Sequence, residues 1–240
     1  MWKVLCQAFF QESGKTDTST NFPTIKKGKK KTMKMNLPNK LSVLRLIMVP
    51  IFMVVMLLPV FTEFEPLVDT ILTLVGAFLF IAASLTDMLD GKIARKYNLV
   101  TDFGKFIDPL ADKFMVIGAL MCIFFTNAGN IRMFTLYFVA LVVVVFRELA
   151  VTAIRLIAAS SKEKVVIAAN MLGKLKTVTQ IVAICAAIIE PVLYSALGAN
   201  IQLLGFAPIT LVTTVLMIYL TIHSGINYIV GAWKYLDPQK

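Results

Sequence analysis

Histidine and cysteine are scarce in this chain. Its 240 residues include one histidine, His223, and three cysteines, Cys6, Cys122 and Cys185, which lie far apart and form no CxxC pair. A single histidine excludes a histidine-based metal cluster within one chain, and the isolated cysteines predict neither a disulfide framework nor a zinc site. We therefore expect three unpaired thiols.

Charged residues are also few, at 16% of the chain, whereas hydrophobic residues make up 58%. The apolar residues form separate blocks, several of them close to the roughly 20 residues that a helix needs to cross a bilayer. This composition predicts an all-α, polytopic membrane protein with one compact domain. The third block is short, so its helix is expected to include Asp108 and Asp112, with Pro109 in or near the first turn. Six transmembrane helices are expected, at residues 43–60, 71–89, 113–126, 133–154, 177–197 and 208–229.

Positive charge is distributed unevenly among the polar segments. Of the 24 lysines and arginines, only Arg132 falls within residues 61–70, 127–132 or 198–207. Because positively charged loops stay on the cytoplasmic side, we expect both termini and the aspartate-rich segment there, in a multi-pass protein of the cell (plasma) membrane. The net charge of +10 then reflects topology and attraction to anionic membrane lipids, and no nucleic-acid partner is expected.

The first 34 residues form a polar tail with the basic run KKGKKK at residues 26–31. We expect this tail to be disordered and to precede a membrane domain of residues 35–240. An alternative is that the physiological chain begins at Met33 or Met35. Residues 36–46, in which Lys40 and Arg45 alternate with apolar residues, predict a short N-terminal interfacial helix that runs into the first span.

Four regularly spaced aspartates flank two of the apolar blocks. Asp87 and Asp90 end the second block, and Asp108 and Asp112 open the third. On a helix, a three-residue step separates side chains by about 60° and a four-residue step by about 40°, so each pair shares one face. Two adjacent antiparallel helices could therefore present four carboxylates to one pocket. Such a cluster at a membrane edge is unfavourable unless something compensates its charge.

Divalent cations would compensate these carboxylates. Oxygen-only sites suit hard cations such as Mg²⁺ or Mn²⁺, and two ions would offset most of the four charges. Near the aspartates, Gly91 and Gly104 allow a ligand to approach the backbone closely, and the planar guanidinium of Arg95 suits a phosphate.

The aspartates belong to a longer pattern, D-x2-D-G-x2-A-R-x8-G-x3-D-x3-D, and the chain meets each fixed position of it: Asp87, Asp90, Gly91, Ala94, Arg95, Gly104, Asp108 and Asp112. The pattern resembles the signature of the CDP-alcohol phosphotransferase (phosphatidyltransferase) family. Its members are membrane enzymes that move a phosphatidyl or similar group from a CDP-linked donor to an alcohol. The resemblance implies a homodimer and four metal-ligating aspartates, the last of which, Asp112, also takes the proton of the attacking hydroxyl as catalytic base. It further implies that Gly91, Arg95 and Gly104 border the nucleotide.

A second stretch, PNKLSVLR at residues 38–45, resembles the N-terminal segment of the same family. The resemblance places Asn39 and Arg45 near the nucleotide. The alternative is that this stretch is a simple basic anchor at the membrane surface.

Two further stretches, FRELAVTAIR at 146–155 and GKLKT at 173–177, resemble the branch of the family that makes phosphatidylglycerophosphate. These stretches contain four cations: Arg147, Arg155, Lys174 and Lys176. Two metal ions and Arg95 already offset the charge of the donor pyrophosphate, so the additional cations predict a phosphorylated acceptor. The resemblance, and not the charge, selects sn-glycerol 3-phosphate over inositol phosphate, with CDP-diacylglycerol as donor. Two lysines two residues apart lie about 200° apart on a helix, so both reach one ligand only if the segment is not regular helix.

Several alternatives remain at this point. A sibling enzyme of the family would use serine, inositol phosphate or phosphatidylglycerol as acceptor. A divalent-cation transporter would distribute its carboxylates through the bilayer, and an aspartate-rich prenyltransferase would use a different spacing. Among single residues, Glu148 is expected to pair with an arginine, and His223 to be a hydrogen-bonded interior residue.

Overall fold

The computed structural model describes residues 36–96, 101–160, 171–198 and 206–233. Within these ranges the chain forms six α-helices and no strand: α2 (Leu37–Phe61), α3 (Pro66–Lys96), α4 (Asp102–Thr126), α5 (Ile131–Ser160), α6 (Met171–Ala196) and α7 (Pro208–Ala232). Each helix contains at least 21 residues that are apolar enough to cross a membrane. The prediction of an all-α protein with six transmembrane helices is confirmed. The tail of residues 1–34, which we expect to be disordered, lies outside the described residues.

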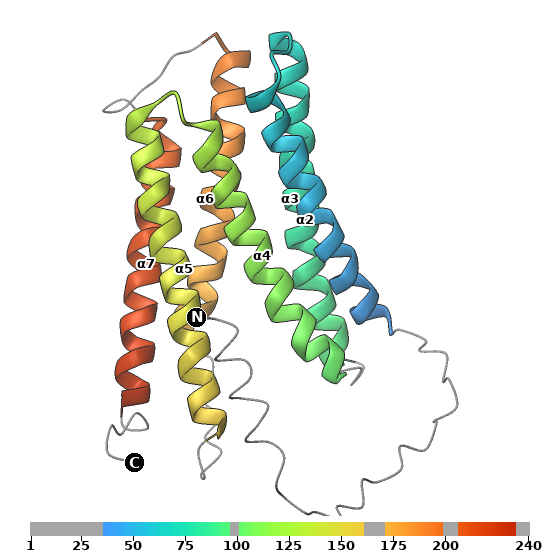
Figure 1. Ribbon diagram of the computed structural model, residues 1–240, viewed down its shortest axis with the longest axis vertical. Helices are drawn as coiled ribbons and strands as arrows, with labels where there is room; N and C mark the ends of the chain where they lie inside the picture. The colour runs from blue at the N-terminus through green and yellow to red at the C-terminus, as the bar shows by residue number, and fades with distance from the viewer. Residues whose placement is uncertain (1–35, 97–100, 161–170, 199–205, 234–240) are drawn as a thin grey trace, which may run out of the picture. The chain divides into compact units, whose positions relative to one another are not determined.

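The helices pack side by side as an antiparallel bundle (Figure 1). Helix α2 packs against α3 and α4, α6 packs against α3 and α7, and α5 packs against α4 and α7. Because successive helices alternate in direction, one end of the bundle collects the starts of α2, α4 and α6 and the ends of α3, α5 and α7. We call this the site end, since the described residues of the sequence motifs lie in the helix segments nearest to it.

Apolar side chains both fill the bundle and cover it. The rings of Phe52 in α2 and Phe80 in α3 lie 5.8 Å apart between their centroids, inside a core that all six helices share. On the outside, large apolar side chains such as Phe78, Phe146 and Val212 are exposed. An extended apolar exterior is unfavourable in water and suits lipid hydrocarbon, so the described helices have the surface of membrane spans.

Helix α4 begins earlier than the hydrophobic pattern suggested. Thr101 has extended backbone angles, and its hydroxyl accepts a hydrogen bond of 3.0 Å from the backbone N–H of Gly104, which caps the helix at Asp102. The prediction that Pro109 lies in or near the first turn is therefore wrong: it lies inside the helix, about two turns from the start. The apolar block marked only the membrane-embedded part of α4.

The expected interfacial segment is continuous with the first span. Residues 37–46 form the opening turns of α2, which runs without a break to Phe61. Its polar residues Asn39, Ser42 and Arg45 recur every three residues and are all buried, so this face of α2 is turned into the bundle. The segment therefore contributes a buried polar face to the site end.

Candidate active site

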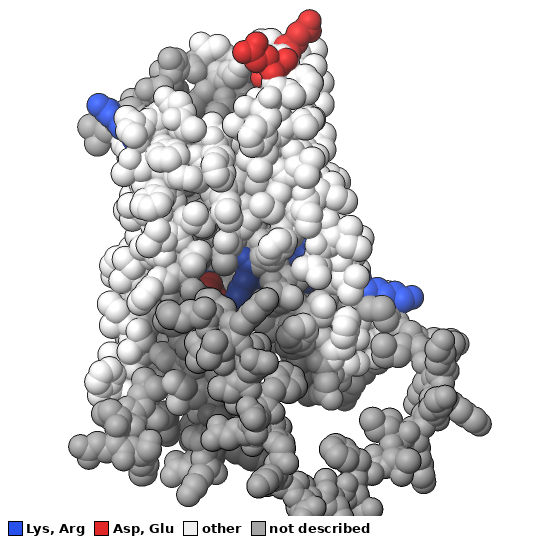
Figure 2. Space-filling view, in the orientation of Figure 1, with Lys and Arg blue, Asp and Glu red and all other residues white. Residues whose placement is uncertain are grey.

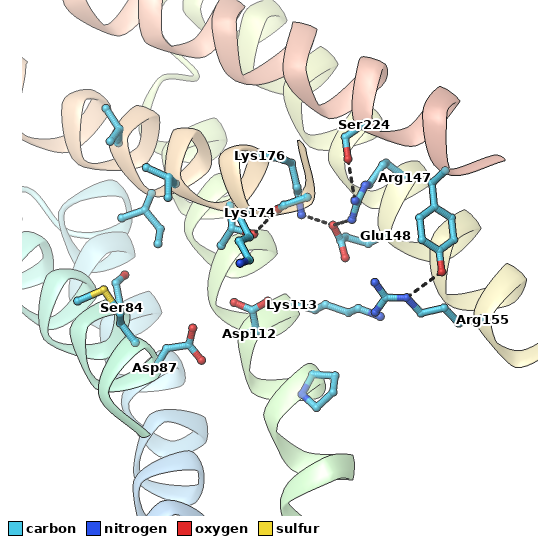
Figure 3. Close-up of a pocket in the computed structure, with 18 of the residues that line it drawn as sticks. Ser84, Asp87, Asp112, Lys113, Arg147, Glu148, Arg155, Lys174, Lys176 and Ser224 are labelled. Carbon is cyan, nitrogen blue, oxygen red and sulfur yellow. Dashed lines mark hydrogen bonds and ion pairs between the residues drawn. The ribbon is translucent and has the colours of Figure 1, made fainter. Parts of the chain in front are cut away.

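A cavity of about 780 Å³ lies at the site end, lined by α3 and α4 and by α5, α6 and α7 (Figure 3). The space-filling view shows Lys or Arg and Asp or Glu atoms inside a hollow, far from the acidic group where α2 joins α3 (Figure 2). Among the described residues, three carboxylates and five cations line the cavity: Asp87, Asp112 and Glu148, and Lys113, Arg147, Arg155, Lys174 and Lys176.

Helix α2 holds two of the aspartates from outside the cavity. Asp87 forms an ion pair with Arg45, which is fully buried, and Asp108 accepts a hydrogen bond from the Ser42 hydroxyl. Of the described aspartates, Asp87 and Asp112 line the cavity and Asp108 does not. The structure thus gives Arg45 a definite contact, with Asp87, whereas its contact with a nucleotide stays a prediction.

The start of α4 is tied to α2 through Thr101. The Thr101 hydroxyl donates to Asn39 Oδ1 at 2.9 Å and accepts from the N–H of Gly104 at 3.0 Å. A Cβ atom at position 104 would stand 3.0 Å from Asn39 Oδ1, which is tighter than most real Cβ contacts. The close approach at Gly104 is thus made by Asn39, and nucleotide contact at either residue stays a prediction.

Asp112 has an oxygen that the described protein leaves without a partner. Its Oδ1 atom is buried and accepts no hydrogen bond from a described residue. Burying a carboxylate oxygen without a partner is costly, and a hard cation would satisfy it. Asp112 and Asp87, which line the same cavity, therefore fit a divalent metal ion as donors.

The full four-aspartate site is not assembled from described side chains alone. No group of three or more His, Cys, Asp or Glu side chains within the described ranges lies close enough to hold one metal ion. The backbone of α3 extends through Asp90, Gly91 and Arg95, but their side chains lie outside what the structure describes.

On the other wall, Glu148 is the centre of a charged cluster. Its Oε1 accepts a hydrogen bond of 3.0 Å from Arg147 and forms an ion pair with Lys176, which is buried. Arg147 also donates to the Ser224 hydroxyl at 3.0 Å. The expectation that Glu148 pairs with an arginine is confirmed, and the pairing also partly neutralises two of the four cations predicted to bind the acceptor.

The other two predicted cations, Arg155 and Lys174, are exposed and form no ion pair with a described carboxylate. Arg155 donates to the Tyr228 hydroxyl at 3.2 Å, and its guanidinium lies 5.5 Å from the centre of the Tyr228 ring. Figure 3 shows the Arg155 side chain extending toward the cavity. Arg155 thus has the contacts to stay extended and the free donors to bind an anion.

Lys174 and Lys176 line the same cavity although α6 is regular helix from Met171 onward. The backbone at these lysines is thus regular helix, and a contact of both lysines with one ligand stays a prediction. Lys176 is buried against Glu148 while Lys174 is exposed, so the long side chains reach the cavity from different sides of α6.

Seven of the eight described charged residues that line this cavity come from three of the four stretches that carried the family resemblance, and the eighth, Lys113, directly follows one of them. A family model for CDP-alcohol phosphatidyltransferase matches residues 35–235. The chain belongs to the CDP-alcohol phosphatidyltransferase family. As a member with six apolar helices, it is a membrane transferase of phospholipid biosynthesis.

Curated relatives agree with this membership. The chain is 39% identical over 208 residues to the CDP-diacylglycerol–glycerol-3-phosphate 3-phosphatidyltransferase of Bacillus subtilis, which covers 84% of this chain and 97% of the relative. The protein of the same name from Rickettsia bellii is 32% identical over 200 residues, or 83% of this chain and 97% of the relative. The protein of that name from Haemophilus influenzae is 36% identical over 152 residues, which are 63% of this chain and 75% of the relative.

Sequence reasoning missed several residues that hold this phosphatidyltransferase site together. Ser42 was detectable, because helical spacing places it on one face with Asn39 and Arg45. Ser224 and Tyr228 also share a face, four residues apart on α7, but nothing in the sequence says that this face meets Arg147 and Arg155.

Sequence reasoning also missed Lys113, the first residue of the third predicted span. It lines the cavity and donates to the Thr152 hydroxyl, which in turn donates to the backbone carbonyl of Glu148 at 2.6 Å. His223 is hydrogen-bonded to Asn227 at 3.1 Å as expected, but its side chain is exposed on the surface of α7, so the prediction of an interior position is wrong.

Proposed function

We propose that this protein transfers the phosphatidyl group of CDP-diacylglycerol to sn-glycerol 3-phosphate, which yields phosphatidylglycerophosphate and CMP. One observation carries the proposal: a single cavity presents signature aspartates on one wall and the cations of α5 and α6 on the other (Figure 3). The names of the relatives support both substrates.

The reaction is a displacement at phosphorus. The hydroxyl oxygen of the acceptor attacks the lipid-bearing β-phosphorus, the bond from that phosphorus to the bridging oxygen breaks, and CMP leaves with its α-phosphate. Asp112 lines the cavity, and the carboxylate oxygen that faces the acceptor is proposed to take the hydroxyl proton. The displacement needs no covalent enzyme intermediate.

We propose two divalent ions, Mg²⁺ or Mn²⁺, as cofactors, held by Asp87, Asp90, Asp108 and Asp112. When bound, such ions neutralise the pyrophosphate and stabilise the leaving oxygen. The protein's own contribution on this wall is to orient the carboxylates, since Arg45 holds Asp87 and Ser42 holds Asp108. Asn39, Arg45, Gly91, Arg95 and Gly104 are proposed to border the nucleotide.

The phosphate of the acceptor is proposed to bind Arg155 and Lys174 first. Both are exposed cations at the cavity without an ion pair to a described carboxylate, and a guanidinium matches a phosphate with two parallel hydrogen bonds. Arg147 and Lys176 add positive potential, although each already contacts Glu148.

A sibling activity with an unphosphorylated acceptor is the second candidate. Glu148 accepts hydrogen bonds from both Arg147 and Lys176, so fewer cations remain to bind a phosphate than the sequence suggested. Serine or another neutral alcohol would need fewer of them.

We further propose that the site end faces the cytoplasm, together with both termini, and that the protein is a homodimer as the family resemblance implies. The orientation rests on the distribution of lysine and arginine in the sequence, because only Arg132 lies within residues 61–70, 127–132 or 198–207. Cysteine labelling of whole cells tests it: a cysteine at Asp69 should be reached from outside, and one at Asp102 should not.

The decisive experiment measures CMP release by the purified protein with CDP-diacylglycerol and one acceptor at a time. Release with sn-glycerol 3-phosphate, and little with serine, inositol phosphate or phosphatidylglycerol, supports the proposal. Release with one of the others and none with glycerol 3-phosphate would overturn it.

A further inference from the structure

A buried glutamine lies beside the proposed catalytic aspartate. Gln180 in α6 is fully buried, and neither its Oε1 nor its Nε2 has a hydrogen-bond partner among the described residues. A buried amide without hydrogen bonds costs folding free energy, and most buried polar side chains are bonded to protein or to ordered water. We therefore expect the buried Gln180 amide to have a function or to bind a partner such as water.

The space next to Gln180 has the size and polarity for water. A small cavity with room of about 10 Å³ is lined by Gln180 together with Asp112, Lys113, Glu148 and Lys176. That volume is about what one water molecule requires, and a buried water needs two to four polar partners. The last four residues also line the large cavity, so the small one adjoins the proposed active site.

Asp112 supplies the second unpartnered group in the same cavity. Its buried Oδ1 atom and the Gln180 amide both lack a described partner, although both residues line this space. One water molecule can bridge the two groups, because it accepts from the Gln180 Nε2–H group and donates to Asp112 Oδ1.

We propose that Gln180 is a positioning residue for Asp112, acting through a water molecule held in this small cavity. The water fixes the orientation of the Asp112 carboxylate, so that the other carboxylate oxygen stays turned toward the acceptor hydroxyl in the large cavity. Gln180 itself touches neither substrate. The inference rests on the proposed role of Asp112 in the transfer reaction.

The test replaces the amide with an apolar side chain of similar size, in the protein purified with its acceptor and divalent ions. Gln180→Leu should lower kcat by about 10-fold to 100-fold, as partners of catalytic ligands commonly do, and leave KM for both substrates nearly unchanged. Gln180→Asn keeps an amide that can bind water and should recover much of the loss. Ile184→Leu, fully buried one turn further along α6, is the matched control and should leave kcat unchanged.

A purely structural role for Gln180 predicts a different result. Removing two unsatisfied polar atoms from the interior should then leave thermal stability unchanged or raised and kcat at the wild-type level, which would overturn the proposal. Equal losses in Gln180→Leu and Ile184→Leu would overturn it as well.

A double-mutant cycle separates action through Asp112 from an independent effect. In an Asp112→Asn background, Gln180→Leu should add little further loss of kcat, whereas a full additional loss would overturn the proposal. All variants are compared with wild type on the acceptor that gives CMP release, so a wrong choice of acceptor counts against the proposed function and not against Gln180.

Discussion

The two walls of the cavity manage their charges in different ways. On the α3–α4 wall, Asp87 contacts Arg45 of α2, and Asp108, which belongs to α4 but does not line the cavity, contacts Ser42 of α2. On the α5–α6–α7 wall, two cations share one carboxylate, because Arg147 and Lys176 both form ion pairs with Glu148. The first wall thus keeps its carboxylates in place for a ligand, while the second neutralises part of its own charge and leaves Arg155 and Lys174 for an anion.

The comparison implies a difference in what a mutation should do. Substitutions on the aspartate wall should abolish catalysis, because these carboxylates are proposed to hold the divalent ions and to take the proton. Substitutions on the cationic wall should divide into two kinds: loss of stability at Glu148, and loss of acceptor affinity at Arg155. The following predictions run from the largest expected effect to the smallest.

Loss of the divalent ions should abolish activity. Treatment with EDTA is expected to stop CMP release, and added Mg²⁺ or Mn²⁺ to restore it; Asp87→Ala should be inactive while still inserting into the membrane. Asp69→Ala, which changes an aspartate at the opposite end of the same helix, is the control and should remain active. Full turnover in chelator would show that the reaction needs no divalent ion, and the aspartate wall would then have no role as a metal site.

Asp112→Asn should lower kcat by about 10²-fold to 10⁴-fold, the usual worth of a positioned general base. Binding of CDP-diacylglycerol, measured separately, should be nearly retained, because the amide is close in size to the carboxylate. A turnover rate near wild type would mean that another group takes the proton.

Glu148→Ala should destabilise the protein rather than act on one kinetic step. It leaves Arg147 and Lys176 without their carboxylate, and breaking a largely buried ion pair in this way costs up to about 3–5 kcal/mol of folding free energy. Thermal unfolding in detergent measures the loss, with the exposed Glu65→Ala as a neutral control. Unchanged stability together with a raised KM for the acceptor would instead place Glu148 in substrate binding.

Arg155→Ala should raise KM for sn-glycerol 3-phosphate by about tenfold, equivalent to about 1.4 kcal/mol, and change KM for CDP-diacylglycerol much less. Arg132→Ala, an exposed arginine at the opposite end of the same helix, should change neither. If both KM values rise together in Arg155→Ala, the cationic wall binds the donor pyrophosphate rather than the acceptor.

Much of this protein could be predicted without its structure. Six apolar blocks dictate six helices, because a chain in hydrocarbon has to satisfy its backbone hydrogen bonds within each span. The spacing of Asp87, Asp90, Asp108 and Asp112 identified the family through its resemblance to the family signature, which the match to the family model confirms. Helix ends were less accurate: the apolar pattern reports burial in the membrane, whereas the start of α4 is decided by the Thr101 cap.

Only the tertiary structure decided which side chains face one another. The sequence shows that Arg45, Gln180 and Tyr228 lie on helices, but contacts between helices depend on their relative rotation and packing, which local periodicity does not contain. Those contacts bring together Arg45 and Asp87, Lys176 and Glu148, and Arg155 and Tyr228, and they put Gln180 and Asp112 in the lining of one space the size of a water molecule. The residue types and their spacing determined the chemistry, and the packing of the six helices determined which groups are free to perform it.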